Sequence, residues 1–209
     1  MIVQNLRHAG WPALLALASV VACSKKPATE DAYVSAFLGG GGGSLCPLGV
    51  NTQVLVVGSM QASTEPMTFP EGQAGLSVDC TVSPSGGGFD IQLSASQPGA
   101  AGGALIVSGH VDGDTGGTVN AQFESQMAGS TYAAITATNN CMLTYTYMGQ
   151  PVPSGERISA GSIFAHIDCP NAETQGGSIS GMQVTTEDGG AANAQCPGTA
   201  DFLFQNCAE

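Results

Sequence analysis

The chain has 209 residues, 43% of them hydrophobic and 10% charged, and its 16 acidic and 4 basic residues give a net charge of −12. Disorder along the whole chain is excluded, because disordered chains combine low hydrophobicity with high charge. Electrostatic binding to nucleic acid or to anionic lipid needs a basic surface, so both are excluded as well. The length suits one domain accompanied by processed or linker segments.

The first 22 residues are typical of an export signal. Arg7 precedes an apolar stretch of 14 residues, Ala9 to Ala22, which is shorter than a membrane span of about 20. The stretch ends in Val20-Val21-Ala22-Cys23, which resembles the lipobox of bacterial lipoprotein precursors. That resemblance implies cleavage before Cys23, a diacylglycerol on its thiol and an acyl chain such as palmitate on its freed amine. The alternative is an ordinary secretory signal, because Val20 and Ala22 also fit a cleavage site of small residues.

Residues 23–45 are expected to tether the domain to the lipid. In the lipoprotein family a residue other than Asp after the lipidated cysteine favours the outer membrane, and Ser24 stands there. The stretch from Ser24 to Ser44 shows no alternating pattern and contains five consecutive glycines, which behave as a flexible coil. We expect at most a short helical turn within it, across Glu30 to Phe37.

Short stretches of alternating hydrophobic and polar residues fill the remainder, 46–209, and predict half-buried strands. The clearest two are joined by Pro84-Ser85-Gly86-Gly87-Gly88, which is typical of a β-hairpin. Asn139-Asn140 is expected to form a turn between two later strands. About ten short strands with turns roughly every 8–12 residues predict an all-β fold, an antiparallel β-sandwich or jelly roll. The expected strands are 52–57, 76–83, 89–96, 104–111, 119–124, 132–138, 141–147, 163–169, 178–186 and 201–207.

The seven cysteines divide into one for lipid and six for disulfides. An exported domain lies in an oxidising compartment, so an even number of cysteines predicts a disulfide-braced fold. Six cysteines allow fifteen connectivities. We expect neighbours in the sequence to pair, and the second pair is the best supported because both of its cysteines fall on apolar strand faces. The expected pairs are Cys46–Cys80, Cys141–Cys169 and Cys196–Cys207.

Two His-x-Asp motifs are candidates for a metal site. His110 stands two residues before Asp112, and His166 two residues before Asp168, so each histidine shares a strand face with a carboxylate. If the two strands were neighbours, the four side chains would suit a divalent transition metal. The favoured interpretation is that they are polar residues on a solvent-facing strand surface.

The segment Asp112-Gly113-Asp114 begins like a calcium-binding loop. An EF-hand requires Asp or Asn at the fifth position and Glu at the twelfth, and this chain has Gly116 and Phe123 there. Asp and Gly are also the residues that a tight turn requires. We therefore expect a hairpin turn, with weak calcium binding by Asp112 and Asp114 as the alternative.

No motif marks a catalytic site. The nearest equivalent of the nucleophile motif G-x-S-x-G, Gly177 to Gly181, has Ile179 at the serine position. No glycine-rich phosphate loop follows a strand and opens a helix. In a domain with 16 acids, chance pairs of carboxylates are expected, so no pair marks a glycosidase. We therefore expect neither enzymatic activity nor a cofactor.

The function predicted from these features is that of an exported protein, lipid-anchored at the bacterial outer membrane or cell surface, with a non-catalytic binding or structural role. One alternative is an envelope hydrolase acting on polysaccharide, and a further one is a calcium- or metal-dependent adhesin. The only tryptophan, Trp11, lies in the signal, which weakens a lectin function. Besides the membrane, the sequence indicates no particular ligand, and it leaves the oligomeric state open.

Overall fold

A computed structural model describes residues 28–39, 46, 52–59, 66–98, 102–127, 130–174, 178–179, 182–185, 191–192 and 195–209. The expected signal at 1–22, the expected lipidation site Cys23 and all of the glycine run except Gly39 lie outside these residues. Within the described part of the chain, no helix has the length and apolar character that crossing a membrane requires.

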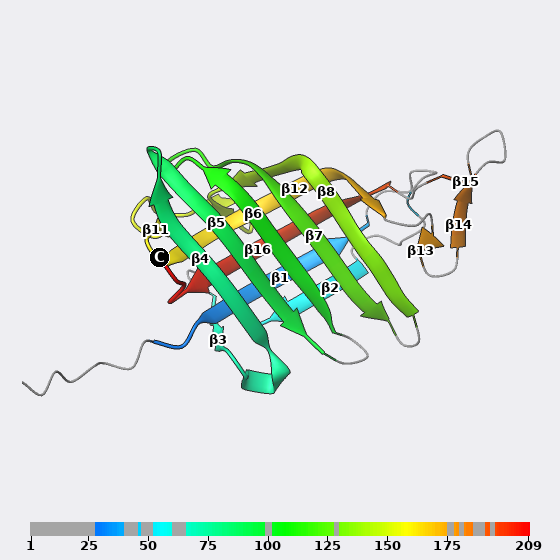
Figure 1. Ribbon diagram of the computed structural model, residues 1–209, viewed down its shortest axis with the longest axis horizontal. Helices are drawn as coiled ribbons and strands as arrows, with labels where there is room; N and C mark the ends of the chain where they lie inside the picture. The colour runs from blue at the N-terminus through cyan, green and yellow to red at the C-terminus, as the bar shows by residue number, and fades with distance from the viewer. Residues whose placement is uncertain are drawn as a thin grey trace, which may run out of the picture.

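One large antiparallel sheet dominates the described residues (Figure 1). Its strands follow the order β2-β1-β16-β12-β8-β7-β6-β5-β4, while β3 pairs with β1 and β11 pairs with β12. A hairpin of β9 and β10 and a small sheet of β13, β14 and β15 do not pair with its strands and form two further sheets. The bounds are β1 (Asp31–Leu38), β2 (Thr52–Val57), β3 (Phe69–Pro70), β4 (Ser77–Ser85), β5 (Gly88–Gln97), β6 (Gly103–Val111), β7 (Gly117–Met127), β8 (Ser130–Thr144), β9 (Thr146–Tyr147), β10 (Gln150–Pro151), β11 (Ile158–Ser159), β12 (Ser162–Thr174), β13 (Ser178–Ile179), β14 (Met182–Thr185), β15 (Ala191–Ala192) and β16 (Gln195–Gln205), with a short 3-10 helix at Gln73–Gly75.

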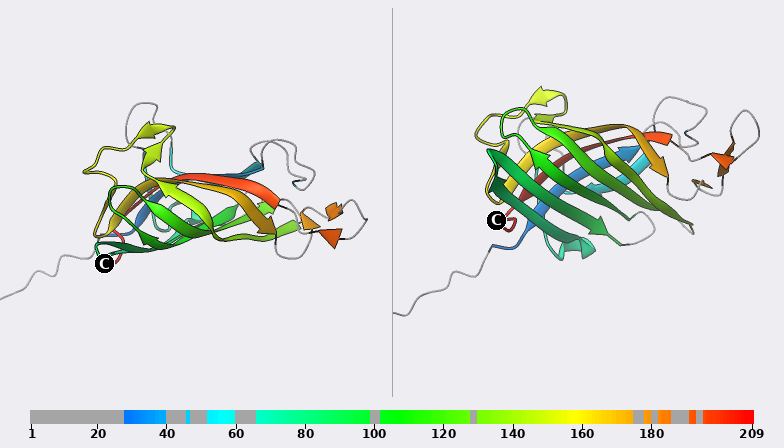
Figure 2. Two further views of the ribbon diagram at one scale, coloured as in Figure 1. Left: turned by 90° about the horizontal axis from the view of Figure 1, so that it is seen from above. Right: turned by 45° about the horizontal axis from the view of Figure 1, so that its top comes forward.

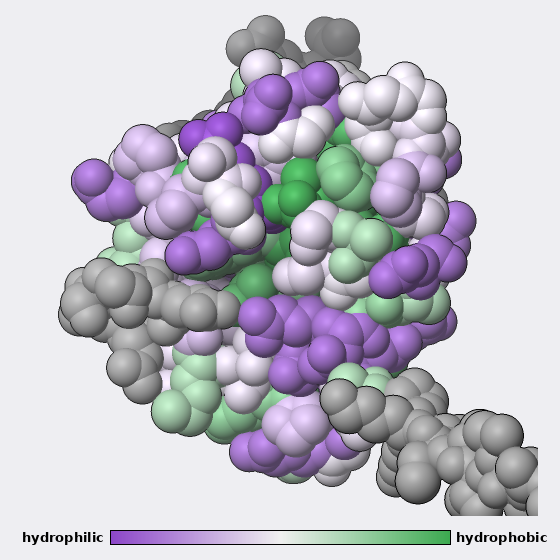
Figure 3. Space-filling view, turned by 90° about the vertical axis from the view of Figure 1, so that its left-hand side faces the viewer, coloured by the Kyte–Doolittle hydropathy of each residue, from purple (hydrophilic) through white to green (hydrophobic). Residues whose placement is uncertain are grey.

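The sheet curls over itself, so that its two halves become the layers of a sandwich. Strands β4 to β8 form one layer and cross the second layer, formed by β12, β16, β1 and β2 (Figures 1 and 2). The layers meet closely at Gly198 of β16, where a Cβ atom would lie 2.8 Å from the Phe123 ring of β7. Seen end-on, hydrophobic residues lie at the centre between hydrophilic ones (Figure 3). The expected all-β, sandwich-like fold with disulfides is confirmed.

The hairpin of β4 and β5 forms as its alternating sequence predicts. Val82 pairs with Ile91 and Cys80 with Leu93, and all four side chains are buried between the layers. The turn is made by Gly86 and Gly87, whose φ angles of 55° and 93° suit glycine. The polar residues between the buried positions therefore face away from the core.

Strand β1 is the largest difference from the sequence prediction. Asp31–Leu38, expected to belong to the tether, form a strand between β2 and β16, so the expected helical turn is wrong. The sandwich consequently begins before Cys46, the expected domain boundary. Both faces of β1 are covered, because the five consecutive residues from 32 to 36 are all buried. A strand buried on both faces has no wet side, and so its sequence does not alternate.

Strand β8 also departs from expectation. It continues through Asn139-Asn140, where a turn was expected between two strands. Its pairing with β7 shifts register between Val119 and Ala121, which is how the sheet accommodates two extra residues of β8 without a turn. Within the expected strand at 178–186, the described residues form two short strands, β13 and β14.

Three disulfides brace the sandwich. The expected pair Cys141–Cys169 is confirmed, and it joins the neighbouring strands β8 and β12. The expected pairs Cys46–Cys80 and Cys196–Cys207 are wrong. The structure instead has Cys46–Cys196 and Cys80–Cys207, with sequence separations of 150 and 127 residues. The reason is topological, because the curled sheet brings the end of the chain back to both of its earlier cysteines.

The C-terminal residues close the outer edge of β4. Ala208 donates a hydrogen bond to the Cys80 carbonyl and accepts one from the Val82 N–H, each at 2.9 Å. On the same edge, the Gly161 N–H donates to the Val82 carbonyl at 3.0 Å. An uncovered edge strand offers its backbone groups to other chains, and this edge is protected along its middle.

Candidate functional site

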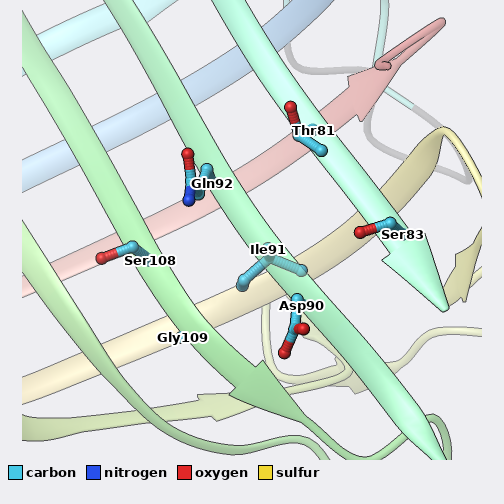
Figure 4. A pocket seen from close by; sticks show the side chains of 7 residues that line it. All are labelled: Thr81, Ser83, Asp90, Ile91, Gln92, Ser108 and Gly109. Atoms are coloured by element: carbon cyan, nitrogen blue, oxygen red, sulfur yellow. The ribbon is translucent and has the colours of Figure 1, made fainter. Parts of the chain in front are cut away.

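The outer face of β4, β5 and β6 carries a dense array of short polar side chains. The register places Thr81 opposite Gln92, and Gln92 opposite Ser108, so these three form a row across the sheet. Figure 4 shows the three side chains side by side on their strands. Strand alternation explains the array, because Val82, Leu93 and Val107 occupy the core on the other face.

Two adjoining depressions hollow this face, and we call them together the outer trough. Their volumes are about 330 and 340 Å³. The central row belongs to both, so the trough runs along the strands on either side of it. Ile91, Leu93 and Val107 point into the core, so their backbone forms the floor. The residues lining the trough are Asp79, Thr81, Ser83, Asp90, Ile91, Gln92, Leu93, Ser94, Ile106, Val107, Ser108 and Gly109.

A carboxylate stands at each end of the trough. Asp90 lies opposite Ser83, whereas Asp79 lies opposite Ser94. Because Asp79 and Ser83 are four residues apart on one strand, the two carboxylates are separated by about 13 Å along it. The hydrogen bond with His110 holds the pKa of the Asp90 carboxyl below its usual value, and a second bond from Ser85 adds to this effect.

His110 completes the Asp90 end. Its Nδ1 lies 2.7 Å from Asp90 Oδ1, and the two side chains are 52% and 56% exposed. The ring sits over the start of β5, where a Cβ on Gly88 would come within 2.9 Å of the ring nitrogen Nε2. The partner of His110 is thus a residue of the neighbouring strand, whereas the sequence had suggested Asp112.

A second His–Asp pair lies on the outer face of the other layer. His166 Nδ1 is 2.9 Å from Asp201 Oδ1, and these side chains are only 29% and 23% exposed. Ser35 and Thr144 continue the row on either side, opposite Asp201 and His166 respectively. His166 therefore pairs across β12 and β16, while Asp168, its expected neighbour, is exposed.

The structure does not bring the metal candidates together. Strands β6 and β12 are separated in the sheet by β7 and β8, so His110 and His166 lie on opposite outer faces. Among the described residues, no group of three or more His, Cys, Asp or Glu side chains is arranged to hold a metal ion. The pKa of the Glu30 carboxyl is raised, mainly by burial and then by the negative charges of Asp79 and Glu71.

The segment from Asp112 to Gly116 is the expected hairpin turn. Asp112 Oδ1 accepts hydrogen bonds from the backbone N–H groups of Asp114 and Thr115, both at 2.9 Å. Both bonds lower the pKa of the Asp112 carboxyl, and the bond from Thr115 has the larger effect. The turn is anchored from outside, because the Tyr145 hydroxyl donates to the Asp112 carbonyl at 2.7 Å. Burial, followed by the Asp112 charge, raises the pKa of Tyr145 to about 12.

An aromatic cluster covers part of the second outer face. The Tyr147 ring from β9 packs edge-on against Tyr33 of β1, with 6.0 Å between centroids, and at a tilt against Phe164 of β12, with 5.1 Å between centroids. All three side chains are buried. Burial, and then the neighbouring Tyr147, raise the pKa of Tyr33. The β9–β10 hairpin thus covers part of the outer face of the second layer. Among the described residues, the outer face of β4 to β6 in the first layer has no such cover.

Comparison of the chain with protein-family models, with curated protein sequences and with solved structures finds no match. The candidate site therefore rests on geometry. Sequence reasoning had singled out the two histidines but missed Thr81, Gln92 and Ser108, because polar residues are expected on the wet face of any strand. The signal that marks them is the repetition of Ser, Thr, Gln and Asn at alternate positions of β4, β5 and β7, to which β6 adds Ser108.

Proposed function

We propose that this protein is exported, anchored by lipid at Cys23 to the bacterial outer membrane or cell surface, and acts there as a non-catalytic binding protein. Its binding face is the outer trough. The observation that carries the binding role is the combination of a hollowed surface and polar side chains from three adjacent strands of a disulfide-braced sheet. Such concave surfaces with a few placed polar groups are where ligands bind.

The spacing of the trough's acids favours binding over hydrolysis. Glycosidases hold their two catalytic carboxyl groups about 5–9.5 Å apart. Asp79 and Asp90 are separated by about 13 Å along the strand direction, which follows from a register that offsets them by four residues. A polysaccharide seated on this face would therefore be held without being cut.

Two features support export and anchoring. Three disulfides are typical of a protein in an oxidising compartment outside the cytoplasm. The sequence Val20-Val21-Ala22-Cys23 resembles the lipobox, and Lys25 and Lys26 beside it suit a membrane with anionic headgroups.

The anchor is tested by metabolic labelling with palmitate in cells that express the full chain. We expect label in the wild-type protein and in a Ser24→Ala control, but none in Cys23→Ser, because that variant lacks the thiol that receives the lipid. Mass spectrometry of the mature N-terminus supplies the second measurement. Label retained by Cys23→Ser, or a mature chain beginning at another residue, contradicts lipid anchoring.

A further inference from the structure

The chemistry of the outer trough defines the class of ligand that it accepts. We propose that the trough binds an uncharged, polyhydroxylated ligand, namely a neutral glycan chain lying along strands β4 to β6. This inference rests on the proposed function in one respect, that the trough is the binding face.

The hydrogen-bonding groups of the trough match hydroxyl groups. Thr81, Ser83, Ser94 and Ser108 each present a hydroxyl that both donates and accepts, and Gln92 presents an amide with separate donor and acceptor atoms. A sugar hydroxyl likewise donates and accepts, so it can be satisfied at every one of these positions. Their short side chains also keep the surface hollow.

The charge of the trough excludes anionic ligands. Asp79 and Asp90 are its charged lining residues, and the lowered pKa of Asp90 keeps this carboxylate ionised at neutral pH. Arg157, the only Lys or Arg in residues 27–209, is bonded elsewhere, to the carbonyls of Val152 and Asp114. Among the lining residues, a cationic polymer would meet two carboxylates about 13 Å apart, whereas a neutral glycan can donate its hydroxyls to both.

An apolar contact completes the match. Ile106 lines the Asp79 half of the trough and is 36% exposed, so it adds an apolar surface among the hydroxyl groups. Sugar rings carry C–H faces as well as hydroxyls, so Ile106 supplies a surface on which one ring can pack. The two depressions on either side of the Thr81–Gln92–Ser108 row then seat successive parts of an extended chain.

Affinity electrophoresis of the full-length protein, extracted in a detergent without sugar groups, tests this inference. The gels contain one of three kinds of polysaccharide: neutral (dextran, galactomannan or xyloglucan), anionic (alginate) or cationic (chitosan). We expect at least one neutral polymer to retard the protein, with no retardation by alginate. Gln92→Ala should weaken this binding about 3- to 10-fold, the effect of losing one or two uncharged hydrogen bonds. Gln53→Ala, an exposed glutamine on β2, is the matched control and should bind as the wild type does.

The possible results separate the ligand class from the binding face. Binding of chitosan or alginate that Gln92→Ala weakens keeps the trough as the binding face and overturns the neutral ligand. Neutral binding that Gln92→Ala and Gln53→Ala leave equally intact overturns the trough itself, as does the absence of retardation by every polymer. Shortening of a bound polymer on incubation contradicts a non-catalytic role.

Discussion

The two outer faces of this sandwich are built on the same strand alternation, but among the described residues a hairpin covers part of one face and leaves the other open. On the first layer, the outer trough presents hydroxyl and amide groups beside the exposed pair of His110 and Asp90. On the second layer, the β9–β10 hairpin places Tyr147 over Phe164, and a similar His–Asp pair is half-buried. A face covered by its own chain contributes stability, whereas the uncovered face is available to a ligand. The difference leads to predictions that separate the two roles.

The largest expected effect concerns the disulfide that joins β4, at one edge of the sheet, to the chain just after β16. Removing Cys80–Cys207 with paired alanine substitutions should destabilise the protein by about 5 kcal/mol, because the bond closes a long loop. The same treatment of Cys141–Cys169, with a separation of 28 residues, should cost about 3.6 kcal/mol. Chemical denaturation of the two double variants measures this difference. Equal midpoints, or the reverse order, contradict a loop-length origin for their stability.

Truncation on the covered face should cost nearly as much. Phe164→Ala removes a ring that is 3% exposed and packed against Tyr147, and should lower the free energy of unfolding by about 3–5 kcal/mol. Gln92→Ala on the open face should stay within about 0.5 kcal/mol of wild type. Thermal and urea unfolding provide the comparison. A large loss of stability in Gln92→Ala would mean that the trough is a structural surface as well.

The two His–Asp pairs provide the smallest contrast. Asp201→Ala should destabilise by about 1–2 kcal/mol, because it leaves the half-buried His166 without its hydrogen-bond partner. Asp90→Ala should have a smaller effect, because His110 can bond to water instead. The pKa of Asp90 is lowered in the folded state, so its contribution is complete above the ordinary carboxyl pKa of about 3.9. It is lost as the pH falls through the lowered value. Melting temperatures of wild type and Asp90→Ala should therefore converge in acid, and a gap that widens there refutes this assignment.

The sequence was most informative where one strand face is wet. The hairpin of β4 and β5 follows from its alternating residues and glycine turn, and both features act locally. Strand β1 could not be recognised in the same way, because Ala32 to Ala36 are buried on both sides and lie next to a glycine run. Its position in the sheet depends on pairing with β16, which lies more than 150 residues away.

The site was less predictable than the fold because its contacts cross between strands. His110 and His166 were identified, but their partners Asp90 and Asp201 stand 20 and 35 residues away in the sequence. Two of the three disulfide pairings expected from the sequence were wrong for the same reason, because the true partners lie far apart in the sequence. The outer trough depends on the sheet's register, which aligns Thr81, Gln92 and Ser108 from three strands, and no local pattern specifies that alignment.

The position of β16 has a consequence for the order of events during biogenesis. Among the described strands β16 comes last in the sequence, yet it lies between β1 and β12, and each of them exchanges backbone hydrogen bonds with it. The second layer, formed by β2, β1, β16 and β12, therefore cannot be completed before the residues up to Gln205 are available. Pairings over such long separations also form slowly. The topology thus makes the second layer the late-forming part of the sandwich, whereas the consecutive strands from β4 to β8 can pair as soon as each neighbour is available.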